Sequence, residues 1–438
     1  MKEANMKEAK KNIDHKINIL LIFGYAVIIG IGLTINLFYG LALSAAGLFF
    51  FIFPSLITRP WIWLVFFAFS YFIDQPGWLP IDLTPVALFI SAVSVGVLIY
   101  SKKPSFSLSK VDIALIIFTL WLVFSWTISG ADDPMKLLKI IFSVVLPYLL
   151  VRYGIRDRSD IRDFLILWLS AGALLALYTL TFIGAGARRL HPPNTNPIPV
   201  AITMSISLFI LFYFMLSERR VSIQYKLALG FLAVPLAVVL FLSGRGAVIA
   251  LMLSLFIFSV LRILLIKKRK LRRGIASSYA ALIVIAISIA PVVLFPMLDD
   301  TRFEGLISGD DASIESRKVL IAESLEHAKD NPLTGIGVEN QYPHNIFIEI
   351  LSESGLIGLM MFLSFILLFF KQATNSFLAG PDGLSLVVLL IVLVLLIEAQ
   401  FSFRLDAHKW LFMFMALFFN LQDMTASSYS RKTRRASR

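Results

Sequence analysis

Apolar runs of about 20 residues recur along this chain, and they constrain its fold more than any other feature. A helix needs about 20 residues to cross the hydrocarbon core of a bilayer. Backbone polar groups in that core must be hydrogen-bonded within the chain, so such runs are expected to be helices. Charged residues make up only 16% of the chain, against about 25% in a soluble protein. The chain is therefore expected to be a membrane protein.

Fourteen runs are candidates for helices. They lie near residues 17–35, 37–57, 61–73, 83–100, 111–128, 137–151, 164–183, 197–216, 227–242, 246–266, 275–297, 345–370, 384–400 and 409–421. The run at 61–73 is short, and the runs at 37–57 and 227–242 could pair or re-enter the membrane. The predicted fold is thus an all-α, polytopic transmembrane bundle of 12–14 helices.

The forty Lys and Arg residues are spread unevenly over the two sides that this pattern defines. Most lie on the side of the N-terminus, including KKRKLRR at 267–273 and RKTRRASR at 431–438. Because basic residues stay on the cytoplasmic side, both termini are predicted to be cytoplasmic. The basic residues form short clusters rather than one continuous surface, which argues against nucleic acid as a partner. No small-residue cleavage site follows the first run, so a retained helix is expected rather than a signal peptide.

This topology predicts three regions. Residues 1–297 are N-terminal transmembrane helices, 298–343 a long periplasmic loop, and 344–438 transmembrane helices with a basic cytoplasmic tail. The chain has no cysteine, so disulfides and thiol chemistry are excluded. No Walker A loop, G-x-S-x-G elbow or H-E-x-x-H motif occurs, and ATP-driven transport and the common hydrolase reactions lose support.

The periplasmic loop contains a predicted amphipathic helix that begins at Asp311 or Ser313 and ends before Asn331-Pro332. Its predicted apolar stripe is Ile314, Ile321, Leu325 and Ala328, and the acidic residues pointing away from it are Glu315, Glu323, Glu326 and Asp330. Arg317 lies at the edge of the stripe, so packing of the stripe would carry Arg317 inward. The alternative is an arginine that only snorkels along apolar surface.

His344 lies where the chain re-enters the membrane, just after Pro343. In the first turn of a helix, the positive end of the helix dipole would keep its imidazole neutral and able to accept a proton. By position alone, a histidine at a membrane interface is more often structural than catalytic. Arg245 lies near the outer boundary between Gly244 and Gly246, and an ionisable residue at this depth marks a site unless it is paired.

Several arginines persist on the outer side, which usually lacks them. Arg188 and Arg189 lie with His191 in ARRLHPPNTNP at 187–197, and one of them could be an interfacial anchor. Together with Arg245 and Arg317, they suit a phosphate ligand, because guanidinium binds phosphate in bidentate fashion and keeps its charge.

The segment ESRKVLIAESLEHAKDNPLTGIG at 315–337, followed by HNIFIEILSESGLIG at 344–358, resembles the signature region of the O-antigen ligase and O-antigen polymerase superfamily. The matching residues of its N-P-x-x-G-x-G turn and the following helix are Asn331, Pro332, Gly335, Gly337, His344, Asn345, Leu351, Glu353, Gly355 and Gly358. S-G-R-G-A around Arg245 is similar to the family's S-R-G/S-R-A element. The resemblance covers about the last 250 residues. Lys318 and Val319 stand where family loop helices often carry Trp.

The resemblance implies transfer of a glycan from undecaprenyl diphosphate, a polyprenyl carrier, at the periplasmic face of the bacterial inner membrane. It implies no metal, cofactor or nucleotide sugar. Arg245 and Arg317 would hold the diphosphate, and His344 would act at the acceptor hydroxyl, which makes these three the predicted catalytic residues. The residues predicted to bind diphosphate or glycan are Arg188, Arg189, Asn345 and Asp406. Asp406 and His408 could instead form a simple helix-end turn.

The acceptor separates two activities that the pattern does not distinguish. Lipid A–core oligosaccharide would make the protein a ligase, and another carrier-linked glycan would make it a polymerase. A lipid-linked oligosaccharide transporter or flippase is the rival class, but it would show repeat symmetry and ionisable residues deep in its helices. No repeat occurs, and Glu398 is the one such charge expected in a late helix. A metal-dependent glycosyltransferase is less favoured, because Asp299-Asp300 and Asp310-Asp311 lack D-x-D spacing.

Overall fold

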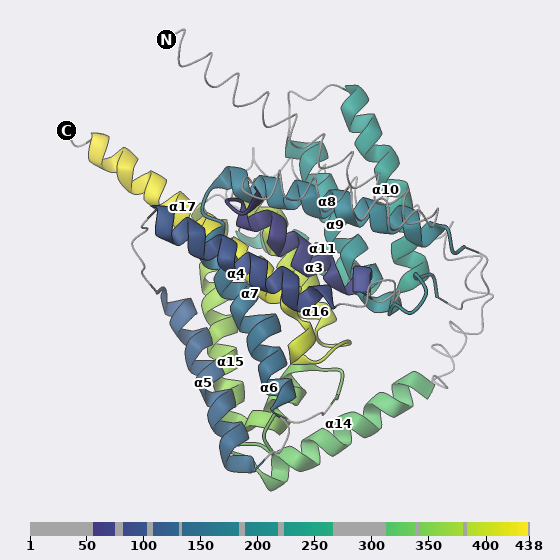
Figure 1. Cartoon of the computed structure of the whole chain (residues 1–438), viewed down its shortest axis with the longest axis vertical. Coiled ribbons are helices and arrows are strands. Elements are labelled where there is room, and N and C mark those ends of the chain that lie inside the picture. The colour runs from purple at the N-terminus through teal and green to yellow at the C-terminus, as the bar shows by residue number, and fades with distance from the viewer. Residues whose placement is uncertain are drawn as a thin grey trace. The chain divides into compact units, whose positions relative to one another are not determined.

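A computed structural model describes residues 56–74, 82–102, 108–130, 134–183, 189–217, 223–265, 312–338, 342–379 and 383–436. It divides into two compact units, Met1–Arg59 and Pro60–Arg438, and the described helices belong to the second. All its regular elements in the described ranges are helical (Figure 1). Six of those helices are long and apolar enough to cross a membrane, or seven if one bent pair is a single span. The prediction of an all-α polytopic bundle is confirmed.

The helices follow the predicted runs closely. They are α3 (Pro60–Asp74), α4 (Leu83–Lys102), α5 (Lys110–Ser129), α6 (Met135–Ile140), α7 (Leu146–Gly154), α8 (Arg158–Leu180), α9 (Pro197–Ser217), α10 (Ile223–Ser243), α11 (Arg245–Leu265), α14 (Ala312–Asp330), α15 (Ile346–Ala379), α16 (Gly383–Glu398) and α17 (Lys409–Ala436). The predicted runs at 17–35, 37–57 and 275–297 and the basic cluster at 267–273 lie outside the described residues. The total of 12–14 helices therefore stays a prediction.

Helix α16 is buried on every side. Its sequence is apolar all round, which is the pattern of a helix in the interior of a bundle. It packs against α9, α11 and α17, and nearly all of its side chains are buried. Its last residue, Glu398, is therefore brought into the interior at one end of the bundle.

Two predicted helices differ in detail from the structure. The run at 137–151 is one span, but it contains a π-helical segment, η1 (Ile141–Val145), between α6 and α7. The predicted outer connection at 243–245 is a break of one residue, Gly244, at which α10 and α11 bend by 120°. Such a pair is a broken span or a re-entrant segment, and the possible re-entry of the run at 227–242 stays a prediction.

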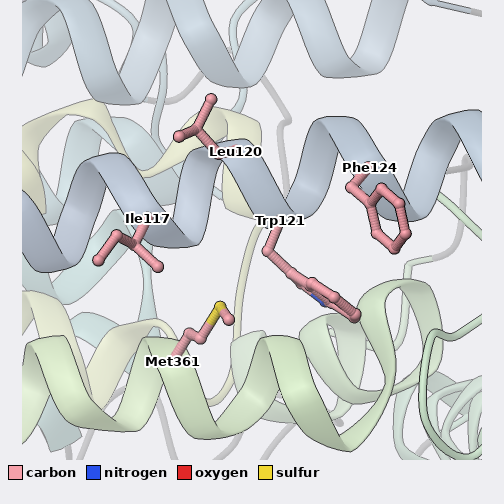
Figure 2. A pocket seen from close by; sticks show the side chains of 5 residues that line it. All are labelled: Ile117, Leu120, Trp121, Phe124 and Met361. Atoms are coloured by element: carbon pink, nitrogen blue, oxygen red, sulfur yellow. The ribbon is translucent and has the colours of Figure 1, made fainter.

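Helices α5 and α15 pack side by side and leave an apolar groove between them (Figure 2). The groove has a volume of about 370 Å³ and is lined by Ile117, Leu120, Trp121, Phe124 and Met361. Leu120 and Phe124 are at least half exposed. Exposed apolar side chains along two long helices are what contact with lipid requires.

A polar cluster ties α5, α7 and α17 together near the beginning of α5. The Tyr148 hydroxyl donates to Asp112 Oδ1 over 2.8 Å, and Arg152 bonds to Asp112, Asn420 and Asp423. Asp112 is 13 residues from Ser125 on the same helix, or about 20 Å at 1.5 Å per residue. The contacts of Ser125 described next thus lie near the opposite end of the bundle.

Candidate functional site

The turn at residues 331–338 fits into a break in α15. Gly355 has a φ of 66° and interrupts the helix, while Gly335 has a φ of 72° in the turn. A Cβ on Gly335 would lie 2.3 Å from the Glu353 carbonyl carbon, and one on Gly355 would lie 2.3 Å from that of Leu333. Only glycine fits either position, because both backbones are left-handed and in close contact.

Hydrogen bonds join the turn to the break. Ile336 N and Gly337 N donate to the carbonyls of Ser352 and Glu353, and Leu356 N donates to that of Pro332. On α5, Ser125 donates to the carbonyls of Thr334 and Glu353, and Trp121 Nε1 to that of Ser354. The break's freed carbonyls are thereby satisfied. This interlock explains the spacing of the N-P-x-x-G-x-G turn and fixes the end of α14 against α15.

Helix α14 has the bounds and the exposed acidic face predicted for the loop helix. Its acidic residues Glu315, Glu323, Glu326 and Asp330 are exposed, as expected. Ser324 and Ala328 are buried and Ile321 is half-buried, but Leu325 is 39% exposed, so its assignment to the buried stripe was wrong. Positions 317, 321, 324 and 328 recur at helical spacing and form the inward face. The stripe is thus rotated toward Arg317, which is half-buried.

Arg317 acts electrostatically on Tyr342, His344 and Glu398, which places its guanidinium near all three side chains. These residues come from the segment before α15 and from the end of α16. The Ile346 amide donates to the Ala399 carbonyl over 3.0 Å, which holds these two segments together. Arg317 and His344 are therefore brought to one place.

His344 was predicted to lie in the first turn of the helix, but it lies just outside α15. Asn345 is the N-cap, and its Oδ1 accepts hydrogen bonds from Phe347 N and Ile348 N at 3.0 and 3.1 Å. His344 has a φ of 59°, in the left-handed region that residues other than glycine seldom adopt. Such strain is concentrated at functional sites. Phe403, which also has a positive φ, donates its amide to the Tyr342 hydroxyl.

The imidazole of His344 is held neutral. Burial lowers its pKa, and the positive charge of Arg317 lowers it further. The helix dipole was expected to be the cause, so the predicted protonation state agrees but its main origin is different. The ring stacks on Tyr342 with centroids 3.8 Å apart. Nδ1 is buried and has no hydrogen-bond partner among the described residues.

Arg245 is the first residue of α11, directly after the bend at Gly244. It is half-buried. The next residue, Gly246, lies against the Glu398 carboxylate: a Cβ there would be 3.2 Å from Oε1. Because Arg317 also acts on Glu398, this carboxylate connects the surroundings of the two arginines.

The segment before α9 packs on the same bend. The Leu190 amide donates to the Leu242 carbonyl, and the Ser243 hydroxyl donates to the Leu190 carbonyl. Arg189 is half-buried beside these contacts, whereas Arg188 lies outside the described residues. The structure thus places Arg189 and Arg245 on neighbouring segments.

Asp406 lies in the short 3₁₀ helix η2 (Leu405–Ala407) and pairs with Arg404, with 3.3 Å between Oδ2 and Nη2. Its Oδ1 is buried and has no partner in the described part of the chain. Burial lowers the pKa of the neighbouring His408 to about 4. Because of its ion pair with Arg404, Asp406 orients this arginine, which was not among the predicted site residues.

A buried ion triad was also missed. Lys136 Nζ lies 2.8 Å from Glu349 Oε1 and pairs with Glu353 as well, and all three side chains are at most 2% exposed. Glu349 Oε2 accepts from Leu405 N at 2.9 Å, so the triad joins α6, α15 and η2. Two carboxylates one turn apart in an apolar helix were the available signal, because they require a cation.

This triad corrects the expectation that Glu398 is the one charge inside a late helix. Glu349 and Glu353 are buried in α15, so the scarcity of deep charges no longer counts against the transporter class. No group of three His, Asp or Glu side chains in the described ranges could ligate a metal ion. The pairs Asp299-Asp300 and Asp310-Asp311 lie outside those ranges, and metal independence stays a prediction.

Comparison with known proteins gives one family. Residues 229–363 match the family model described as O-antigen ligase. The matched part runs from α10 into α15 and includes Arg245, Arg317 and His344, but neither Lys136 nor Glu398. A search of curated proteins finds none that matches the chain. The family match supports the resemblance inferred from the signature residues.

Proposed function

Because residues 229–363 match the O-antigen ligase family model, we propose that this protein transfers a glycan from undecaprenyl diphosphate to lipid A–core or a similar acceptor. The family acts on lipid-linked glycans in general, and the specific donor and acceptor are our proposal. The observation that carries the proposal is the position of Arg317. Its positive charge interacts electrostatically with His344 and Glu398, and the Glu398 carboxylate lies against the start of α11, which bears Arg245.

In the proposed reaction, the acceptor oxygen attacks the anomeric carbon of the donor glycan. The bond from that carbon to the diphosphate oxygen breaks, and undecaprenyl diphosphate leaves with the electron pair. Arg245 and Arg317 stabilise the negative charge that develops on the leaving group, and Arg189 is placed to contribute. Neutral His344 accepts the proton of the acceptor hydroxyl.

We place this reaction at the periplasmic face of the bacterial inner membrane, with both termini in the cytoplasm. Support comes from the excess of Lys and Arg in the connections on the side of the N-terminus. The same assignment puts the ends of α5, α10 and α16 and the beginnings of α6, α11 and α15 outside. The contacts of Lys136 with Glu349 and of Gly246 with Glu398 join these helix ends to one another, which supports placing them on one side of the membrane.

Two other activities use similar groups. A polymerase would differ only in taking a second carrier-linked glycan as the acceptor. A flippase would move the lipid-linked glycan without cleaving any bond, and the buried charges of α6 and α15 are compatible with that class. The fate of the bond to the diphosphate therefore separates the transferases from the flippase.

A reconstituted assay tests the proposed function. Purified protein, supplied with undecaprenyl-diphosphate-linked glycan and lipid A–core in EDTA, is expected to release one undecaprenyl diphosphate per glycan transferred. A ladder of longer carrier-linked glycans would identify a polymerase instead. Intact donor with translocation across proteoliposomes, or activity that returns only with Mg²⁺ or Mn²⁺, would overturn the proposal.

A further inference from the structure

Glu398 is a buried carboxylate to which the proposed mechanism gives no role. Its side chain ends between the last turn of α16 and the start of α11, and the residue is 2% exposed. A Cβ on Gly246 would lie 3.2 and 3.3 Å from its two carboxylate oxygens, so the carboxylate is in close contact with the start of α11. Oε2 is buried and, among the described residues, has no hydrogen-bond partner.

Burial disfavours the ionised form of Glu398, whereas a hydrogen bond from the Ser402 side chain and the positive charge of Arg317 in α14 favour it. Arg245 precedes Gly246 on α11, the helix that packs against the carboxylate. The carboxylate therefore lies in the surroundings of both arginines proposed to hold the diphosphate. A buried carboxylate is tolerated when a nearby cation compensates for its charge.

The other elements packed against α16 supply no competing charge. Helix α9 contains no Asp, Glu, Lys, Arg or His. At the start of α17, the Lys409 ammonium donates to the Phe67 carbonyl, away from Glu398. His408 is neutral because burial lowers its pKa to about 4.

A diphosphate that binds Arg317 would bring negative charge beside this carboxylate. Two anions this close in a site with little water repel each other strongly, and one of them takes up a proton if it can. We infer that Glu398 is the counter-ion of Arg317 in the empty site and takes up one proton when the donor diphosphate binds. This inference rests on the proposed function and adds a proton linkage to its first step.

Calorimetric titration with undecaprenyl diphosphate in nanodiscs tests the linkage directly. The dependence of the observed enthalpy on the ionisation enthalpy of the buffer gives the number of protons taken up. At pH 8, the parent protein is expected to take up about one proton more than Glu398→Gln. As the pH rises, binding to the parent should weaken relative to this variant by up to about tenfold per pH unit, which is the limit for one linked proton.

Two further variants make the test specific. Glu323→Gln removes an exposed glutamate of α14 and should match the parent. Ser402→Ala removes a hydrogen bond that favours the ionised carboxylate, so it should lower proton uptake even if Glu398→Gln does not fold. Equal proton uptake by the parent and whichever of Glu398→Gln and Ser402→Ala folds, or weaker binding to Glu398→Gln, would overturn the inference. Absence of binding to the parent would overturn the proposed function as well.

Discussion

Arg317→Lys is expected to lower the rate of glycan transfer by about 10²–10³, by analogy with the loss of one oxyanion-hole donor. Lysine keeps the positive charge but cannot make the planar, bidentate contact of a guanidinium with phosphate. The variant should also bind undecaprenyl diphosphate more weakly than the parent. Initial rates with carrier-linked glycan and titration with undecaprenyl diphosphate measure the two effects separately.

Lys318→Arg is the matched control, because the neighbouring side chain is 66% exposed and pairs with Glu315 at the surface. It exchanges the same two residue types in the opposite direction and should keep the parent's rate. A rate near that of the parent for Arg317→Lys would show that only the charge of Arg317 matters. The assignment of a bidentate diphosphate contact would then be wrong.

His344→Ala is expected to lower transfer by about 10²–10⁴, the usual contribution of a general base. Donor binding should change little, since the diphosphate is assigned to the arginines. Tyr342, which stacks on the His344 ring, supplies a structural comparison. If Tyr342→Leu, which removes the stacked ring, and His344→Ala reduce the rate equally, the histidine has a packing role and not a base role.

The pH dependence of transfer is a second test of the general-base role of His344. Its pKa is lowered, so the unprotonated, active form predominates at neutral pH and is lost only as the pH falls below the usual value of about 6.5. The rate should therefore fall up to tenfold per pH unit on the acid side. Arg317→Lys keeps the charge and should leave this acid limb in place, whereas Arg317→Gln should move it to higher pH.

Much of the fold followed from residue patterns. In the described ranges, each long helix except α14 of the loop agrees with a predicted apolar run, although α17 extends beyond its run, because a spanning helix requires a length that few other structures share. The end of α14 at Asp330 followed from Asn331-Pro332. The bend at Gly244 and the break at Gly355 were not predicted as such, because they depend on which backbone approaches each glycine.

The site was predictable where charge stood out against an apolar background. Arg245, Arg317 and His344 were found in this way, and the structure brings Arg317 and His344 together. Leu325 was misplaced because its helix is anchored by the turn that follows it, which sets its rotation about its own axis. Lys136 was overlooked since its partners Glu349 and Glu353 are more than 200 residues away in the sequence.

Asn345 illustrates a residue whose role in the signature is visible only in three dimensions. Its side-chain oxygen caps α15 and thereby fixes the backbone on which His344 is held in a left-handed conformation. The two signature glycines act similarly, because the interlock of Gly335 with Gly355 positions α14 and hence Arg317. The signature thus combines residues for chemistry with residues that position them.

The central claim is that the donor diphosphate binds between Arg245 and Arg317, next to His344. The most direct test is an experimental structure of the parent protein in nanodiscs with undecaprenyl diphosphate bound. We expect the diphosphate to contact both guanidiniums, with the carboxylate of Glu398 beside it and His344 facing the position of the glycosyl carbon. Diphosphate bound instead near Arg152, at the opposite end of the bundle, would contradict this account.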